Sequence, residues 1–368
     1  MAAKTNKVLI LIPGENARGG ITNYYQHIKE ELPREVIYFR RGARNWPKRS
    51  GPLSELIRMA SDYLRFMRVL TKERVALVQT TTAFYKPSIL RDGIFLLLAR
   101  WMGVKRIVFF RGWNDDFANN LGGLLRTFFN RTFFKAQAII DLSQRNVDQL
   151  RQMGYTGKLY LETTLVGKDM VAHLNINELI AKRKAAATKP ILYLSRLEAF
   201  KRIYELLQVY QNLKVRNSSY QLVFAGDGGE EQPLKEKINK EGITDVLLTG
   251  FVTGEQKNEL FEKAAIFVFL SDFEGMPNAV LEAMAFGLPV VTTNVGGIST
   301  VFEHDQNGIL LEKKAIDLVE QGILSILEDE ENYQNISKRN YQKAREQFWS
   351  DRVGKRMTQI FNEVLANQ

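Results

Sequence analysis

The chain of 368 residues contains no cysteine and only three histidines, and its 51 lysines and arginines outnumber its 41 acidic residues to give a formal net charge of +10. The absence of cysteine excludes disulfides, thiolate nucleophiles and zinc–thiolate sites, and the scattered histidines argue against a histidine-rich metal centre. At about 100–200 residues per domain, the length predicts two domains, each able to bury a core without covalent cross-links.

Short apolar runs alternate with helical patterns along the chain. The apolar runs predict buried parallel strands at residues 7–12, 75–79, 106–110, 138–142, 191–194, 221–225, 245–249, 266–270 and 289–292. Helical patterns occur between and around them, for example at residues 21–32, 53–70, 204–213, 258–264 and 351–365. Such alternation predicts an α/β fold, and the strands are too many for one modest sheet. We therefore expect two doubly wound, Rossmann-like domains.

The boundary between the two domains is expected within residues 161–190, where a basic, alanine-rich stretch ends at Pro190. The expected division is an N-terminal domain over residues 1–165 and a C-terminal domain over residues 166–345. A final segment over residues 346–368 carries the last predicted helix.

The segment at residues 271–291, SDFEGMPNAVLEAMAFGLPVV, contains the most informative pattern. A loop with Glu274 follows a predicted strand, and Pro277 suits the first turn of the next helix. Backbone N–H groups over residues 276–279 would then lie at the carboxyl end of a parallel strand, where a helix N-terminus suits a diphosphate. Glu282, one turn inside, can accept hydrogen bonds from ribose hydroxyls. The alternative is a solvated loop acid and a helix acid favoured by the dipole.

Three weaker signals precede this segment. Arg196 follows a predicted strand and Lys201 comes five residues later, and two such cations before a helix can neutralise a leaving diphosphate, although each alone would be taken for a surface residue. Gly226 begins a glycine-rich turn after the next strand, which is a weak phosphate signal. Gly250 and Phe251 end the strand after that, and they offer either a backbone platform for a base or a simple turn.

In this order, the four signals resemble the retaining GT-B glycosyltransferases, specifically group 1 (family 4) of nucleotide-sugar-dependent enzymes. The resemblance covers nearly the whole chain and is most specific over residues 190–311, where Glu274 and Glu282 match that family's paired-glutamate motif with seven residues between. It implies a GT-B fold, in which two Rossmann-like domains face each other across a cleft and a C-terminal helix returns to the N-terminal domain.

The resemblance also implies roles for single residues. Arg196 and Lys201 would bind the donor diphosphate, Glu274 the donor sugar and Glu282 the ribose. The other expected contacts to the nucleotide sugar come from Gly226, Phe251, Gly275, Met276, Pro277, Asn278 and Ala279.

The N-terminal half matches the family less closely. Gly19 and Gly20 resemble the family's glycine pair near the donor phosphates, because paired glycines let the backbone approach a phosphate; a flexible turn is the alternative. Arg111 stands where many members have a histidine at the end of a strand. It stays protonated and is a poor general base, so we expect it to contact the acceptor or a phosphate. Asp115 and Asp116 would serve the acceptor hydroxyl or cap the next helix, and capping is favoured.

The sequence contains no Asp-x-Asp motif. In the other major glycosyltransferase architecture this motif holds a divalent metal on the diphosphate. Arg196, Lys201 and a helix N-terminus offer a metal-free way to stabilise the same leaving group. We therefore expect no metal site, and no cofactor besides the nucleotide-sugar donor substrate.

The positive charge is concentrated in the first half of the chain. Residues 1–165 carry a net charge of +14 and residues 166–368 a net charge of −4, which indicates an anionic partner for the N-terminal domain. Basic and apolar residues mix at residues 40–49 and 121–135, which predicts docking on an anionic bilayer; a core-facing helix beside a charged loop is the alternative. No apolar stretch reaches the ~18 residues of a membrane-spanning helix. We expect a cytoplasmic protein, peripheral on the inner face of the cell membrane.

These observations together favour a retaining, metal-independent hexosyltransferase of bacterial polysaccharide or glycoconjugate assembly. It would move a hexose or N-acetylhexosamine from a nucleotide sugar, UDP-sugar being favoured over GDP-sugar, to a glycan or polyprenyl-diphosphate-linked acceptor. A nucleotide-sugar epimerase of the same fold and a non-catalytic nucleotide-sugar-binding subunit remain open. Nucleic-acid binding is disfavoured, because the aromatic residues of the basic half lie in apolar runs and not in a stacking motif.

Overall fold

The computed structural model describes residues 7–14, 20–33, 35–42 and 51–366. Gly19 and most of the basic segment at residues 40–49 lie outside these ranges. The chain divides into two units: the first is Met1–Thr164 with Ser350–Gln368, and the second is Leu165–Trp349.

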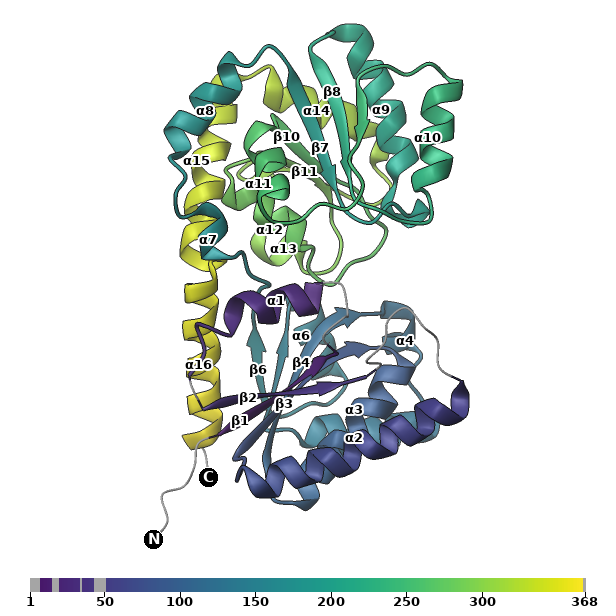
Figure 1. Ribbon diagram of the computed structural model, residues 1–368, viewed down its shortest axis with the longest axis vertical. Helices are drawn as coiled ribbons and strands as arrows, with labels where there is room; N and C mark the ends of the chain where they lie inside the picture. Colours follow the sequence, from purple (N-terminus) through teal and green to yellow (C-terminus); the bar gives the residue numbers. More distant parts are fainter. Residues whose placement is uncertain (1–6, 15–19, 34, 43–50, 367–368) are drawn as a thin grey trace. The chain divides into compact units, whose positions relative to one another are not determined.

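The first unit is built on a parallel sheet of six strands in the order β2-β1-β3-β4-β5-β6, with helices on both faces (Figure 1). The strands are β1 (Val8–Pro13), β2 (Val36–Arg41), β3 (Leu77–Phe84), β4 (Lys105–Trp113), β5 (Ala138–Asp141) and β6 (Lys158–Leu161). The helices are α1 (Gly20–Ile28), α2 (Pro52–Lys72), α3 (Lys86–Trp101), α4 (Asp115–Asn119), α5 (Gly123–Thr132), α6 (Gln144–Gln152) and α16 (Ser350–Ala366), with a 3-10 turn at Phe133–Lys135.

The second unit repeats this architecture with the strand order β12-β11-β10-β7-β8-β9. The strands are β7 (Lys189–Leu194), β8 (Tyr220–Ala225), β9 (Val246–Leu248), β10 (Ile266–Phe269), β11 (Val290–Thr293) and β12 (Gly308–Leu311). The helices are α7 (Lys168–Val171), α8 (Ile176–Ala185), α9 (Ile203–Arg216), α10 (Glu231–Lys240), α11 (Gly254–Lys263), α12 (Asn278–Ala285), α13 (Ile298–Val301), α14 (Val319–Leu327) and α15 (Glu330–Gln347), with 3-10 turns at Ala199–Lys201 and Ile316–Leu318.

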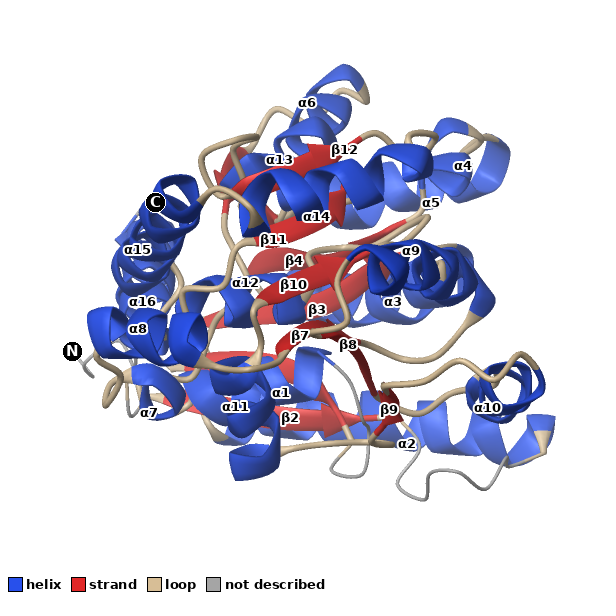
Figure 2. Cartoon of the chain, turned by 90° about the horizontal axis from the view of Figure 1, so that it is seen from above, coloured by secondary structure: helices blue, strands red, loops and turns tan. Residues whose placement is uncertain are grey.

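Both sheets confirm the predicted α/β class with two Rossmann-like sheets, shown as red strands between blue helices in Figure 2. Every pairing within a sheet is parallel. In the second unit the chain runs from β7 through β8 to β9 on one side, and from β10 through β11 to β12 on the other. The neighbouring strands β7 and β10 therefore form the topological switch point, at whose carboxyl edge α/β sheets bind ligands.

The last helix, α16, packs on the first unit, as the sequence predicted. Arg356 donates from Nε and Nη2 to the two carboxylate oxygens of Glu162, at 2.8 and 2.9 Å. Lys105 Nζ donates to the carbonyl oxygens of Val364 and Leu365 near the end of the helix, at 3.1 and 2.7 Å. Because Glu162 is only 3% exposed, its pairing with Arg356 ties the helix to the end of β6.

The stretch at residues 161–190, where the domain boundary was expected, contains the helices α7 and α8. Arg183 in α8 is 4% exposed and donates to four backbone carbonyl groups at the ends of α11 and α12. The acceptors, at 2.8 to 3.4 Å, are the carbonyl oxygens of Phe261, Glu262, Phe286 and Gly287. Burial lowers the pKa of Arg183. A basic residue in an alanine-rich stretch thus satisfies the carbonyl groups that two helix ends leave unpaired.

Candidate functional site

The loops after β7 and β10 are joined at the switch point of the second unit. The backbone N–H of Asp272 donates to the carbonyl oxygen of Phe200 at 3.0 Å, and the rings of Phe200 and Phe273 stack with centroids 4.6 Å apart. Arg202 donates to the Asp272 carboxylate from Nε and Nη2, at 2.8 and 2.6 Å. The residues that follow the two strands therefore form one assembly.

This assembly brings together Lys201 and Glu274, two of the residues predicted from the sequence. Their side chains form an ion pair and are 7% and 19% exposed. Lys201 Nζ also lies 4.9 Å from the centre of the Phe269 ring, and Ser271 Oγ donates to Glu274 at 3.4 Å. A largely shielded ammonium group at the end of a parallel strand is well placed to bind an anion, because little water competes for it.

Glu282 lies in the middle of α12, one turn from its start, as the sequence indicated. Its side chain is 3% exposed and accepts a hydrogen bond at 2.9 Å from Lys257 of α11, a contact that the sequence did not suggest. Pro277 is the residue before the first turn of α12 and not part of it, which corrects the predicted position by one residue. No side chain caps this N-terminus.

Close approach of backbone explains two of the glycines at this edge. Gly226 has φ +144°, and a Cβ there would lie 1.9 Å from the carbonyl oxygen of Ser195. Gly296, which the sequence analysis did not single out, has φ +57°, and a Cβ there would lie 2.2 Å from the carbonyl oxygen of Gly275. The loop after β8 is thus packed on the loop after β7, and the loop after β11 on the loop after β10, without side chains between the backbones.

The other predicted donor contacts lie around the assembly. Arg196 is exposed and makes no hydrogen bond or ion pair with the described part of the chain. Phe251, after Gly250 at the end of β9, is 54% exposed. Met276 and Ala279 are almost fully buried, so that only their backbone could serve a ligand.

Arg111, Gly20, Asp115 and Asp116 belong to the first unit. Gly20 is the first residue of α1. Arg111 is near the end of β4, and its guanidinium donates to Thr164 Oγ1 at 3.1 Å. The favoured capping role of the two aspartates is wrong: Asn114 caps α4, because its side-chain oxygen accepts from the backbone N–H of Phe117 at 2.7 Å. Asp115 forms an ion pair with Arg145 at 3.3 Å instead.

Among the described residues, no group of three or more histidine or acidic side chains could hold a metal ion. The helices within the same ranges are all too short or too polar to cross a membrane.

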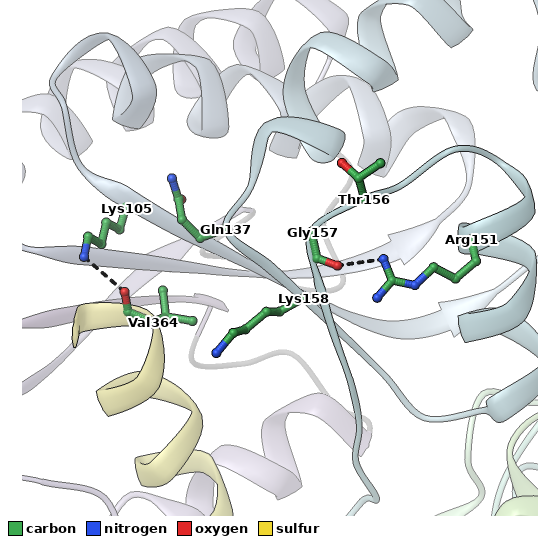
Figure 3. A pocket seen from close by; sticks show the side chains of 7 residues that line it. All are labelled: Lys105, Gln137, Arg151, Thr156, Gly157, Lys158 and Val364. Atoms are coloured by element: carbon green, nitrogen blue, oxygen red, sulfur yellow. Dashed lines mark hydrogen bonds between the residues drawn. The ribbon is translucent and has the colours of Figure 1, made fainter. Parts of the chain in front are cut away.

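A cavity of about 530 Å³ lies at the amino edge of the first sheet, near the amino ends of β4, β5 and β6 (Figure 3). Lys105, Arg151 and Lys158 line it. Lys105 already donates to the end of α16, and Arg151 Nη1 donates to the carbonyl oxygens of Tyr155 and Gly157 at 2.9 and 2.7 Å. Since α/β sheets bind ligands at the carboxyl edge, this cavity does not lie where a ligand of the first sheet is expected.

Comparison with solved structures defines the class of the fold. The structure of Anabaena HepE in complex with UDP superposes with a TM-score of 0.69 over 97% of this chain and 100% of that chain, at 16% sequence identity. This likeness, together with the two parallel six-stranded sheets and the returning α16, defines a GT-B fold.

The second unit matches a family model. Residues 176–343, somewhat less than half of the chain, match the model of the family described as Glycosyl transferases group 1. N-acetyl-alpha-D-glucosaminyl L-malate synthase of Bacillus anthracis is 30% identical over 181 residues, which cover 49% of this chain and 46% of the relative.

A second relative matches a longer stretch. The N-acetylgalactosamine-N,N'-diacetylbacillosaminyl-diphospho-undecaprenol 4-alpha-N-acetylgalactosaminyltransferase of Campylobacter jejuni is 29% identical over 215 residues, which cover 58% of this chain and 57% of the relative. The chain thus spans about half the length of the curated relatives that it matches.

Proposed function

We propose that this protein is a retaining glycosyltransferase that transfers a hexose or N-acetylhexosamine from a UDP-sugar to an acceptor of bacterial polysaccharide or glycoconjugate assembly. The observation that carries the proposal is the shielded Lys201–Glu274 pair at the switch point of the second unit. Glu282 lies in the same unit on the helix that follows the Glu274 loop, so the carboxylates for the sugar and the ribose lie along one chain segment.

The chemistry follows from the charges of these side chains. In the donor complex, Lys201 and the unpaired Arg196 stabilise the diphosphate as it leaves, and the N-terminus of α12 adds its backbone dipoles. When the diphosphate binds Lys201, Glu274 is released to accept hydrogen bonds from the sugar hydroxyls. Glu282 must likewise exchange Lys257 for the ribose hydroxyls.

The acceptor's proton needs no strong protein base in this scheme. The transition state is loose and resembles an oxocarbenium ion, and the departing diphosphate stays on the face of the sugar where the acceptor enters. The diphosphate itself can take the proton. This agrees with Arg111, a residue that stays protonated, in the place where many members of the family have a histidine.

The named relatives support the proposal. Two of them make or transfer alpha-linked amino sugars by their names, and the solved HepE complex contains UDP. The acceptors in those two names, L-malate and a diphospho-undecaprenol, are both anions at neutral pH. We therefore favour an anionic acceptor, with the lipid-linked diphosphate as the first candidate.

The stereochemistry of the product tests the proposal. A panel of α-linked UDP-, GDP- and ADP-sugars is first scored for slow hydrolysis, which reveals the donor without a known acceptor. With the donor found, proton NMR of the new glycosidic linkage is expected to show an α-linked product. A β-linked product would refute the mechanism, and epimerised sugar or no turnover would favour the epimerase or the non-catalytic alternative.

Metal independence is a separate prediction. Because Lys201, Arg196 and the α12 N-terminus supply the positive charge for the diphosphate, donor hydrolysis is expected to persist at full rate in excess EDTA. Complete loss of activity in EDTA that Mn²⁺ or Mg²⁺ restores would show that the phosphates are handled differently.

Docking on an anionic membrane remains a proposal, and the structure changes the residues assigned to it. The predicted segment at residues 121–135 mostly faces the core: Phe129 and Phe133 are fully buried, in a cluster that Leu125, Phe128 and Phe134 join. One face of α2 is exposed and apolar instead, with Leu53, Leu56, Ile57 and Leu64 between 53% and 71% exposed. Basic residues of the same helix flank this face.

Vesicle binding measures this docking. The protein is expected to bind vesicles with anionic lipid and to release with added salt, because the attraction is screened. The double substitution Leu56→Ser and Ile57→Ser on α2 should weaken binding, whereas Leu124→Ser, at a residue that is 91% exposed on α5, should not. Equal binding to neutral vesicles, or none to either kind, would count against docking.

A further inference from the structure

Three arginines of the described chain, the buried Arg41 and Arg183 and the partly exposed Arg111, differ in how their charge is compensated. Arg41 forms an ion pair with Asp92 at 3.1 Å and also donates to the carbonyl oxygen of Thr81. Arg183 donates to four carbonyl groups. Arg111 forms no ion pair within the described ranges, and its one hydrogen bond there is to the hydroxyl group of Thr164. A shielded guanidinium group with so little compensation is costly to the folded protein.

The surroundings of Arg111 hold the guanidinium in place without neutralising it. The group lies 4.2 Å from the centre of the Tyr24 ring and 5.1 Å from that of Phe109. Its Nη1 atom is buried and has no hydrogen-bond partner within the described residues. The hydroxyl group of Tyr24 is likewise buried and without a hydrogen-bond partner there. Two unused donors thus lie in one cluster near the carboxyl ends of β4 and β6.

The acidic residue Glu162 does not supply the missing charge. Glu162 lies close enough to influence Tyr24, but both of its carboxylate oxygens accept hydrogen bonds from Arg356. Arg111, Glu162 and Arg356 together therefore carry one uncompensated positive charge. Burial lowers the pKa of Arg111 and raises that of Tyr24, so the tyrosine is a neutral donor at physiological pH.

We infer that Arg111 and Tyr24 together bind an oxyanion of the acceptor, either a carboxylate or a phosphate group. The bound oxyanion would compensate the positive charge of Arg111. It would also accept hydrogen bonds from Arg111 Nη1 and from the Tyr24 hydroxyl group. Arg111 is partly exposed, so an anion can reach its guanidinium group. Its Nη1 atom and the Tyr24 hydroxyl group are covered, so the Arg111 side chain must shift to bring both donors to the anion. That the anion belongs to an acceptor rests on the proposed function; that an anion binds here does not.

Thermal unfolding of the full-length protein with small anions tests the inference. Pyrophosphate and L-malate serve as the phosphate and carboxylate probes, each compared with sodium chloride of equal ionic strength. At saturating concentration, one of them is expected to raise the unfolding temperature of the wild type by about 2–4 °C. The probe that does so identifies the oxyanion, and no shift with either would overturn the inference.

Variants then separate this site from others. Arg111→Met, which keeps the length of the side chain and removes the charge, is expected to unfold at or above the wild-type temperature and to lose the anion shift. Tyr24→Phe keeps the ring under the guanidinium and should lose part of the shift. Arg145→Met, at a side chain that is 71% exposed, should keep all of it. An unchanged shift in both Arg111→Met and Tyr24→Phe would overturn the inference.

The test also distinguishes the two proposals. Its readout is unfolding, so it does not require turnover. An anion shift that depends on Arg111, in a protein that hydrolyses no nucleotide sugar, would overturn the proposed function and leave the anion site standing. Donor hydrolysis in a protein whose unfolding temperature no anion raises would overturn the anion site and leave the proposed function standing.

Discussion

Lys201→Met is expected to lower the turnover number by about 10²-fold, because the substitution removes the shielded positive charge that stabilises the departing diphosphate. Steady-state kinetics with the donor found by hydrolysis measures the effect. Lys235→Met is the matched control, since Lys235 is exposed on α10 and distant in sequence from the loops of the site. It should leave turnover unchanged.

A second variant separates catalysis from stability in this pair. Lys201→Met leaves Glu274 without its counter-charge, so some loss of stability is expected along with the loss of turnover. The double variant Lys201→Met with Glu274→Gln removes both charges and should regain stability, because replacing both partners of a shielded pair is nearly neutral. Its turnover should stay low. Wild-type turnover in the double variant would refute the assignment.

Arg183→Met is expected to lower the free energy of unfolding by about 3–5 kcal/mol, which would make it one of the most harmful single substitutions outside the donor site. Four carbonyl oxygens at the ends of α11 and α12 lose their donor, and three of them belong to the buried residues Phe261, Phe286 and Gly287. Chemical denaturation followed by circular dichroism measures the change.

The neighbouring residue provides the control for this prediction. Lys182 is exposed on the same helix, so Lys182→Met should shift the midpoint of denaturation very little. Because Arg183 also fixes the far end of α12, the helix that carries Glu282, the Arg183→Met protein should bind UDP more weakly. Equal midpoints for the two variants would contradict the bonding role of Arg183.

Strands that are covered on both faces could be predicted from the sequence, because their apolar runs are almost unbroken. Three strands, β2, β6 and β12, fall outside every predicted run, and each is an edge strand of its sheet. The four residues of β6 illustrate the reason: none of them is fully buried, so polar residues are tolerated and the apolar signal is weak.

The candidate site divides along similar lines. Lys201 and Glu274 could be predicted because each lies in the connection that follows a strand, and the topology of parallel sheets brings such connections to one edge. Lys257 and Gly296 could not, because their importance comes from a partner far away in the sequence: Glu282 in one case and the carbonyl group of Gly275 in the other. The role of Arg183 could not be predicted for the same reason. Arg183 lies in the basic, alanine-rich stretch where the domain boundary was expected.

The place of α16 in the first unit has a consequence for how this protein is made. A ribosome translates residues 165–349 before it reaches α16, so the second unit can fold as one uninterrupted piece while the first still lacks a helix. Until then Glu162 has no Arg356 to pair with and must stay hydrated or protonated. In nascent chains that stop before residue 350, the first unit should therefore be incompletely folded, and proteases should cleave it at the end of β6. The second unit of the same chains should already resist proteolysis.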